Sequence, residues 1–127
     1  MTVAFLSDEW VAELKERLNQ DEAFRRASSG AEATLQQVIS TPDGERRYWI
    51  RVDHGTIDMA PGDAERPDAT IVQDRETAAG LARGEVNPVS AFMTGKLKVQ
   101  GSMMLLMQLQ SALGELPRVM AEMDVDY

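Results

Sequence analysis

The chain offers few side chains suited to catalysis or to metal binding. His54 is the only histidine, and the 127 residues include no cysteine. A lone histidine does not suggest a nucleophilic triad or a histidine-type metal centre, and the lack of thiols excludes thiolate zinc sites. Because His54 stands between Asp53 and Gly55, its position favours a tight turn.

The carboxylates are numerous, but they lie in polar surroundings. Asp8-Glu9, Asp21-Glu22 and the segment 63–65 are typical of helix starts or solvated loops. None of them stands in an apolar segment that would raise its pKa for general acid catalysis. The chain also has no Gly-x-Ser-x-Gly elbow, P-loop or dinucleotide fingerprint. We therefore expect no enzyme activity, no metal and no other cofactor.

The segment best suited to bind a ligand is apolar. Residues 103–109 read Met-Met-Leu-Leu-Met-Gln-Leu. A helix that is apolar on most sides is covered on most sides or faces a cavity, and methionine adapts to irregular apolar shapes. The pattern suggests a pocket for a lipid-like molecule, with ordinary core packing as the alternative.

Composition limits the partners and the compartment. The formal net charge is −8, and no run of lysine or arginine is present, which argues against a nucleic acid partner. The N-terminal residues do not form a signal peptide, and the longest apolar run, Met103 to Met107, is too short to span a bilayer. Without cysteines the chain suits a reducing compartment. We expect one cytoplasmic domain over residues 1–127.

Hydrophobic periodicity predicts helices at both ends and strands between them. Apolar residues at helical spacing predict an amphipathic helix over about 8–19, capped by Ser7, and a short helix over 21–27. Alternating residues and turn signals then predict five strands: 34–39, 46–52, 57–59, 69–72 and 96–100.

Capping residues predict where the later helices begin. Asp74 is expected to cap a helix that ends near Arg83, and Asn87-Pro88 to start another that Gly95 closes. Gly101-Ser102 precedes the methionine-rich helix, which Gly114 and Pro117 are expected to interrupt before one last helix.

The second predicted strand has two different faces. Tyr48, Ile50 and Val52 alternate onto one face, which we expect to be covered by helices. Trp49 lies on the other face between two arginines. We expect Trp49 to be half-buried against the arginine stems; a dimer contact or a membrane contact is the alternative.

The run from Gly84 to Gln110 resembles a known family. Its parts, in order, are Gly84-x-x-Asn87-Pro88, Ser90-Ala91-Phe92-Met93, Gly95-Lys96-Leu97-Lys98-Val99, Gly101 and the Met/Leu helix ending Leu109-Gln110. This order is similar to the signature of the sterol carrier protein 2 (SCP2) lipid-transfer domain, and the resemblance covers about residues 30–112.

The resemblance implies an α+β fold of the SCP2 type. Such a fold has a five-stranded, largely antiparallel sheet with helices over one face and an apolar tunnel between the two layers. Residues 113–127 would then form a lid helix over the tunnel mouth and an acidic tail. The chain ends Val125-Asp126-Tyr127, which is not a Ser-Lys-Leu type peroxisomal address.

The family also implies a set of ligand-binding residues. These are Ile50, Phe92, Met93, Met103, Leu106, Met107, Leu109, Gln110 and Leu113. Some alternatives remain open: Phe92 also suits the core, and Gln110 suits either a lipid head group or solvent. Lys96 and Lys98 suit either an acidic head group or a solvated strand face.

The expected function is the non-enzymatic binding and transfer of a hydrophobic molecule. Fatty acids, acyl-CoAs, sterols and isoprenoid or quinone lipids are the implied ligands, and transient membrane contact is a further expectation. The alternative is an accessory module that presents such a molecule to a partner enzyme. The oligomeric state is left open by the sequence.

Overall fold

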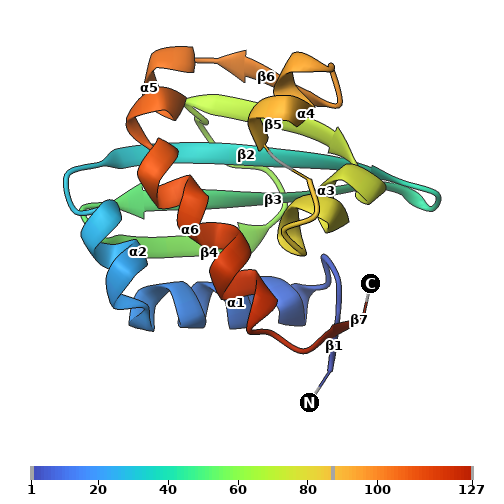
Figure 1. Ribbon diagram of the computed structural model, residues 1–127, viewed down its shortest axis with the longest axis horizontal. Coiled ribbons are helices and arrows are strands. Elements are labelled where there is room, and N and C mark those ends of the chain that lie inside the picture. The colour runs from blue at the N-terminus through green and yellow to red at the C-terminus, as the bar shows by residue number, and fades with distance from the viewer. Residues whose placement is uncertain (1, 87, 127) are drawn as a thin grey trace.

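The protein folds as a sheet with helices over one of its faces (Figure 1). The computed structural model describes residues 2–86 and 88–126, apart from the side chains of Pro88, Val89, Met103, Leu106, Gln110, Ser111 and Leu113. In chain order the elements are β1 (Val3–Ala4), α1 (Asp8–Gln20), α2 (Glu22–Ala27), β2 (Glu32–Thr41), β3 (Gly44–Asp53), β4 (Thr56–Pro61), β5 (Ala69–Asp74), α3 (Arg75–Ala82), α4 (Pro88–Met93), β6 (Leu97–Gly101), α5 (Met103–Gln108), α6 (Gln110–Ala121) and β7 (Val125–Asp126).

The main sheet has five strands in the order β4-β3-β2-β5-β6. Strands β2, β3 and β4 form an antiparallel meander, and β6 runs antiparallel to β5. Within this sheet only the central β2–β5 pair is parallel. The connection from β2 to β5 runs through strands β3 and β4. The predicted α+β fold with a five-stranded, largely antiparallel sheet is therefore confirmed.

The inner face of the sheet carries the core. Leu35, Ile50 and Ala69 are neighbours across β2, β3 and β5 and are buried. Trp10 of α1 packs edge-on against Tyr48 of β3, with ring centroids 5.5 Å apart. Phe5, just before α1, also packs edge-on against Trp10, with ring centroids 5.2 Å apart. The predicted inward face of β3 is thus the one that the helices cover.

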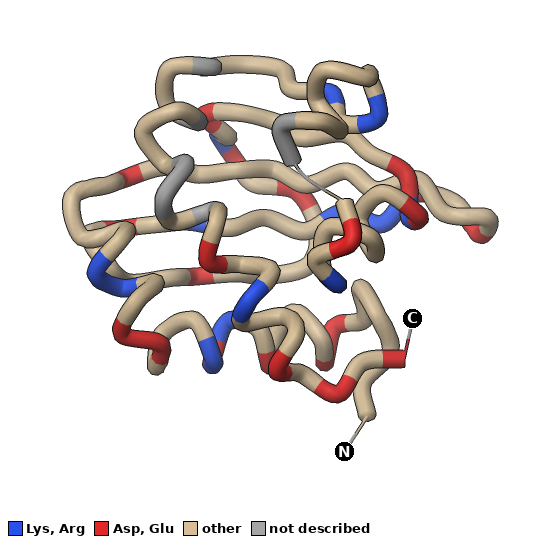
Figure 2. The backbone as a smooth tube through the Cα atoms, viewed as in Figure 1, with Lys and Arg blue, Asp and Glu red and all other residues tan. Residues whose placement is uncertain are grey.

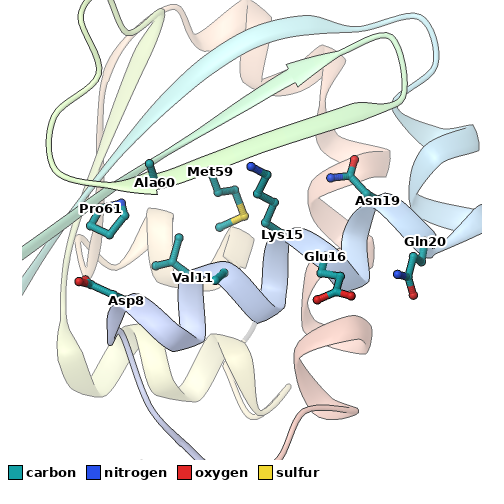
Figure 3. Close-up of a pocket in the computed structure, with 10 residues that line it drawn as sticks. Asp8, Val11, Lys15, Glu16, Asn19, Gln20, Met59, Ala60 and Pro61 are labelled. Carbon is teal, nitrogen blue, oxygen red and sulfur yellow. The ribbon is translucent and has the colours of Figure 1, made fainter.

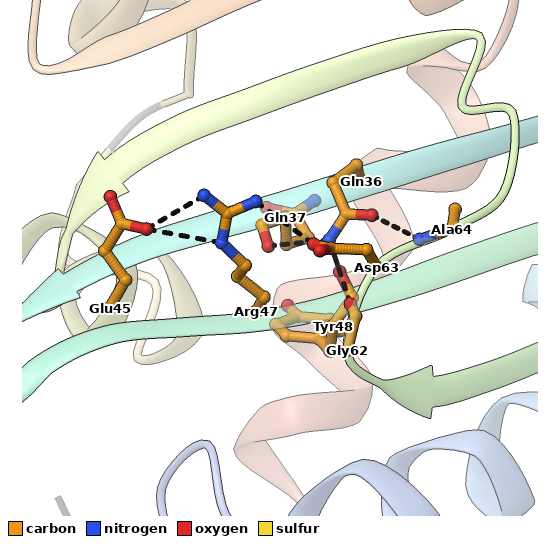
Figure 4. Close-up of polar contacts among 8 residues, drawn as sticks. All are labelled: Gln36, Gln37, Glu45, Arg47, Tyr48, Gly62, Asp63 and Ala64. Carbon is orange, nitrogen blue, oxygen red and sulfur yellow. Dashed lines mark hydrogen bonds and ion pairs between the residues drawn. The ribbon is translucent and has the colours of Figure 1, made fainter.

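The outer face is partly covered by the loop between β4 and β5 (Figure 4). Gln36 points outward from β2 but is buried, because its Nε2 donates to the Gly62 carbonyl (3.1 Å) and its Oε1 accepts from the Ala64 amide (2.6 Å). Arg47 pairs with Asp63 of the same loop (3.1 Å). Trp49 is half-buried beside this loop, as predicted.

Side-chain caps begin four of the helices at the predicted places. Ser7 accepts from the Trp10 amide, Asp21 from Phe24, Asp74 from Thr77 and Ser102 from Leu105. Each cap satisfies a backbone N–H that has no partner within its helix. The predicted cap at Asn87 lies outside the described residues.

One expectation about the C-terminal helices was wrong. Helix α6 continues through Gly114 and Pro117, and the break comes earlier, at Leu109. A proline inside a helix removes one hydrogen bond. Here the loss is offset by a buried stripe at helical spacing that runs past Pro117, formed by Leu109, Ala112, Val119, Met120 and Met123.

The two chain ends pair with each other, which the sequence did not reveal. Val3 and Ala4 of β1 lie parallel to Val125 and Asp126 of β7. The segment expected as an acidic tail is thus paired with the strand just before α1, and both termini lie at the same corner of the molecule (Figure 1). Within the part of the chain that the structure describes, no helix is both long enough and apolar enough to cross a bilayer.

Candidate ligand-binding site

A cavity of about 140 Å³ lies between the sheet and the helices. Its walls come from the segment before α1, from the inner face of the sheet and from α1, α3 and α6. The apolar lining residues are Phe5, Leu6, Trp10, Ile39, Tyr48, Ile50, Ile71, Ala78, Leu81, Ala82, Leu97, Leu116, Pro117 and Met120.

Two glutamines interrupt this apolar lining. Gln73 of β5 donates from Nε2 to Oε1 of Gln37 on β2 (3.4 Å), and both side chains are buried. The Oε1 atom of Gln73 and the Nε1 atom of Trp10 are buried with no hydrogen-bond partner among the described residues. Such groups are rare in folded proteins because each costs about 1–3 kcal/mol of stability. Both atoms belong to residues that line the cavity, so a polar group held there could give each of them a hydrogen-bond partner.

The cavity is electrically neutral. None of the lining residues that the structure describes is an aspartate, glutamate, lysine, arginine or histidine. Tyr48 is the one ionisable residue among them, and burial raises the pKa of its hydroxyl well above the usual value. The hydroxyl therefore stays protonated at physiological pH, and the site has no charge to balance an ionised ligand.

The volume limits what the closed site holds. A cavity of about 150 Å³ accepts a molecule the size of benzene. The present cavity therefore has room for one end of a lipid, and a longer molecule needs a wall to move. Leu116, Pro117 and Met120 place helix α6 along one of these walls.

Helix α6 is held to α2 by an ion pair. Arg118 of α6 reaches the carboxylate of Asp21, which also caps α2. The hydrogen bond from Arg118 is the main cause that holds the pKa of Asp21 below its usual value. Glu115 and Glu122 pair with the same guanidinium at 2.8 and 3.7 Å.

A larger hollow of about 500 Å³ runs along the surface between α1 and β4 (Figure 3). Charged residues, including Asp8, Lys15 and Glu16, lie along this groove. Asn19 fixes α1 to the edge strand there, because its Nδ2 donates to the Ile57 carbonyl (2.9 Å) and its Oδ1 accepts from the Ile57 amide (2.8 Å). Apolar residues, including Val11 and Met59, also lie along it. Because the groove is open along the surface, it does not enclose a lipid chain as the cavity between the sheet and the helices can.

The turn at His54 is a surface feature, as predicted. His54 adopts a positive φ of 47° and its ring nitrogen lies 2.7 Å from the Asp53 carboxylate. Glu32 is close to both residues, but all three are exposed and Glu32 already pairs with Arg51. An exposed cluster of this kind does not indicate a metal site.

Among the predicted ligand-binding residues whose side chains the structure describes, Ile50 alone lines the cavity. Leu109 is buried in the adjoining core. Phe92, Met93 and Met107 are exposed near the β6 edge of the sheet. The side chains of Met103, Leu106, Gln110 and Leu113 lie outside the described residues, and the ligand-binding role of the set stays a prediction.

Sequence reasoning missed the polar residues of the cavity, although a signal was present. Gln37 alternates with Leu35 and Ile39, and Gln73 follows Ile71 by two positions. A strand with period two places both glutamines on the apolar face. A polar side chain on a buried face needs a partner, and this rule applied to the two strands is enough to single out the pair.

The sequence and the fold have clear relatives. Residues 11–114 match the model of the SCP-2 sterol transfer family. The chain is 34% identical to rat (Rattus norvegicus) "Sterol carrier protein 2" over 101 residues, covering 78% of this chain but only 18% of that protein. It is 26% identical to a Caenorhabditis elegans "Non-specific lipid-transfer protein-like 1" over 112 residues, covering 87% of this chain and 92% of the relative.

Solved structures agree with this assignment. A crystal structure of sterol carrier protein 2 superposes with a TM-score of 0.81 at 26% sequence identity, covering 94% of this chain and 98% of the other. The fold of the chain and its sequence match over residues 11–114 therefore point to the same family. The chain belongs to the SCP-2 sterol transfer family.

Proposed function

We propose that this protein binds a hydrophobic molecule in the cavity between the sheet and the helices and carries it without chemical change. The observation that carries the proposal is a neutral apolar cavity with two buried polar atoms that lack partners among the described residues. The family and the names of the relatives, a sterol carrier protein and a lipid-transfer protein, support it. Burial of an alkyl chain contributes about 0.8 kcal/mol for each methylene.

The two unpartnered atoms favour a ligand with a neutral hydroxyl end. Gln73 Oε1 only accepts hydrogen bonds, and Trp10 Nε1–H only donates them. A hydroxyl group is able both to donate and to accept, whereas a carboxylate only accepts. An ionised carboxylate would also bring an uncompensated charge into an apolar cavity, which is unfavourable. We therefore expect the cavity to prefer an alcohol over the ionised fatty acid of equal length.

Exchange of the ligand would require α6 to move. Leu116, Pro117 and Met120 line one wall of the cavity, and Arg118 holds their helix to Asp21. We propose that α6 acts as the lid expected for the C-terminal segment, opening when its contacts with α2 are lost. Cytoplasmic transfer between membranes would use this motion for uptake and release.

An accessory role is the second candidate. The chain spans only 18% of the length of rat sterol carrier protein 2 and 20% of a Xenopus tropicalis "Hydroxysteroid dehydrogenase-like protein 2", to which it is 24% identical. The same kind of unit thus occurs within longer proteins. In this reading the protein would present its ligand to a partner enzyme instead of moving it between membranes.

Native mass spectrometry of the untreated purified protein tests the proposal. We expect a bound mass that corresponds to one neutral lipid per chain, and saturable competition by a long-chain alcohol against a fluorescent lipid. The proposal fails if no mass is bound and no alcohol, sterol, fatty acid, acyl-CoA or quinone binds saturably. Weak lipid binding together with one stoichiometric enzyme partner in a pull-down would favour the accessory role.

A further inference from the structure

We propose that the edge formed by α4, β6 and α5 docks on the surface of an anionic lipid bilayer. Four large apolar side chains on this edge are exposed: Phe92 (43%), Met93 (79%), Met104 (72%) and Met107 (72%). Two lie on α4 and two on α5, the helices at either end of β6 (Figure 1). They are all the large hydrophobic side chains found exposed in the part of the chain that the structure describes.

The same edge carries two exposed lysines in an acidic protein, with Asp74 of the neighbouring strand β5 close to Lys96. Lys96 and Lys98 are exposed between the two helices, and the stretch 86–114 contains these two lysines and no aspartate or glutamate. The whole chain carries −8. Figure 2 shows blue and no red where α4 meets β6. An anionic surface would repel most of the remaining protein more strongly than this edge, so the charges favour an approach through the edge.

The chemistry of the edge suits a bilayer better than a protein groove. Helices α4 and α5 have six residues each and stand apart at the two ends of β6. Separate apolar side chains beside lysines match an interface in which rings and thioethers enter the acyl boundary and ammonium groups remain at the head groups. A shared apolar groove for a peptide would need the two helices to lie together.

Helix α1 does not offer the same chemistry. Its apolar residues Trp10, Leu14 and Leu18 are buried against the sheet. Its first turn is acidic, with Asp8 and Glu9, and is exposed. This face would be repelled by an anionic membrane.

The docking edge adjoins the cavity. Leu97 lines the cavity, and its neighbours Lys96 and Lys98 are exposed. Helix α5 leads through Leu109 directly into α6, which forms one cavity wall. Docking would therefore bring the start of α6 toward the membrane, while the wall residues Leu116, Pro117 and Met120 lie further along that helix. The docking surface itself does not depend on whether the cavity binds a ligand.

Vesicle flotation with the full chain tests the proposal. Phosphatidylcholine vesicles with phosphatidylglycerol should bind the protein, and phosphatidylcholine alone should bind it weakly. Lys96→Glu/Lys98→Glu should lower the partition coefficient about tenfold or more, since each cation near an anionic surface contributes to binding. Arg25→Glu/Arg26→Glu is the matched control, because it makes the same charge change at exposed positions of α2 and should retain clearly more binding.

A second variant tests how much the exposed apolar side chains contribute to vesicle binding. Met104→Gln/Met107→Gln should weaken vesicle binding with no change in far-UV dichroism, because both side chains are exposed. Equal loss in the two charge variants, equal binding to both vesicle types, or binding that survives the methionine changes would overturn the proposal. So would a concentration-dependent dimer abolished by the methionine changes in a protein that binds no vesicles, since a second copy would then be the occupant.

Discussion

Gln73 donates a hydrogen bond to Gln37 at the floor of the cavity, and its own Oε1 atom is left without a partner among the described residues. The pair lies on neighbouring parallel strands, β2 and β5, within an otherwise apolar lining. A buried acceptor of this kind is satisfied only by a donor that enters the cavity.

Gln73→Met should therefore separate ligands by their ability to donate. We expect the affinity for a long-chain alcohol to fall about fivefold to tenfold, which corresponds to about 1 kcal/mol for a lost hydrogen bond. The methyl ether of the same alcohol has no donor, so its affinity should change little. Competition against a fluorescent lipid measures both, and Gln100→Met, at an exposed position of β6, is the control. Equal losses for alcohol and ether would contradict the assigned role of Gln73.

Filling the cavity should prevent binding without unfolding the protein. Ala78 of α3 lines the cavity and is buried. Ala78→Phe would place a ring in the 140 Å³ space, and we expect the lipid affinity to fall more than about tenfold. The free energy of unfolding should change by less than about 3 kcal/mol, the usual upper cost of overpacking.

Urea unfolding and lipid titration of Ala78→Phe give the two quantities. Ala121→Phe, at an exposed position of α6, controls for an added aromatic ring. If Ala78→Phe binds lipid as well as the unchanged protein does, the ligand lies elsewhere.

Asp21→Asn should loosen α6 while keeping the cap of α2. Asparagine caps helices as well as aspartate does, but it cannot form the ion pair with Arg118. We expect faster lipid dissociation and a lower free energy of unfolding at neutral pH. Asp43→Asn, in the exposed turn between β2 and β3, should have neither effect.

The effect of Asp21 on stability has a defined dependence on pH. The folded pKa of Asp21 is lowered by Arg118, so its contribution is fully present above the pKa of an aspartate in the unfolded chain, about 3.9. The contribution is lost as the pH falls through the lower folded value. The free energies of unfolding of the unchanged protein and of Asp21→Asn should differ at neutral pH and converge in acid. If the difference persists in acid, the ion pair with Arg118 is not its source.

Gln36→Ala should destabilise the outer face of the sheet. Gln36 bonds to both Gly62 and Ala64 of the β4–β5 loop and to the Tyr48 carbonyl (3.2 Å). Loss of these bonds leaves buried polar groups unsatisfied, and we expect the free energy of unfolding to fall by ~2 kcal/mol. Gln100→Ala, at an exposed position, should change it by less than ~0.5 kcal/mol. Trp49 fluorescence should also shift, because this residue lies beside the loop.

Much of the fold was predictable because its signals are local. The alternation of Tyr48, Ile50 and Val52 placed β3 and its inner face, and Ser7, Asp21 and Asp74 marked helix starts through bonds that span three residues. The prediction that the helix breaks at Pro117 was wrong, because packing of the helix against the core overrode the local rule that proline interrupts a helix. The buried stripe on α6, and not the proline, determined how far that helix extends.

The candidate cavity was less predictable because it depends on distant contacts. The methionine-rich segment drew the prediction to α5, where Met104 and Met107 are exposed, and the ligand-binding role of that helix stays a prediction. The cavity joins residues from Phe5 to Met120. A run of apolar residues indicates that some surface must be covered, but it does not say by which element.

The sequence by itself determined the family, the strand faces, the helix caps and the acidic character of the chain, because each follows from neighbouring residues. Only the tertiary structure decided that Trp10, Gln37 and Gln73 meet around one cavity and that Phe92, Met93, Met104 and Met107 remain at the surface. The β2–β5 pairing and the position of α6 set these contacts. These contacts join residues far apart in the chain, and a local hydrophobic period does not indicate which distant residues meet.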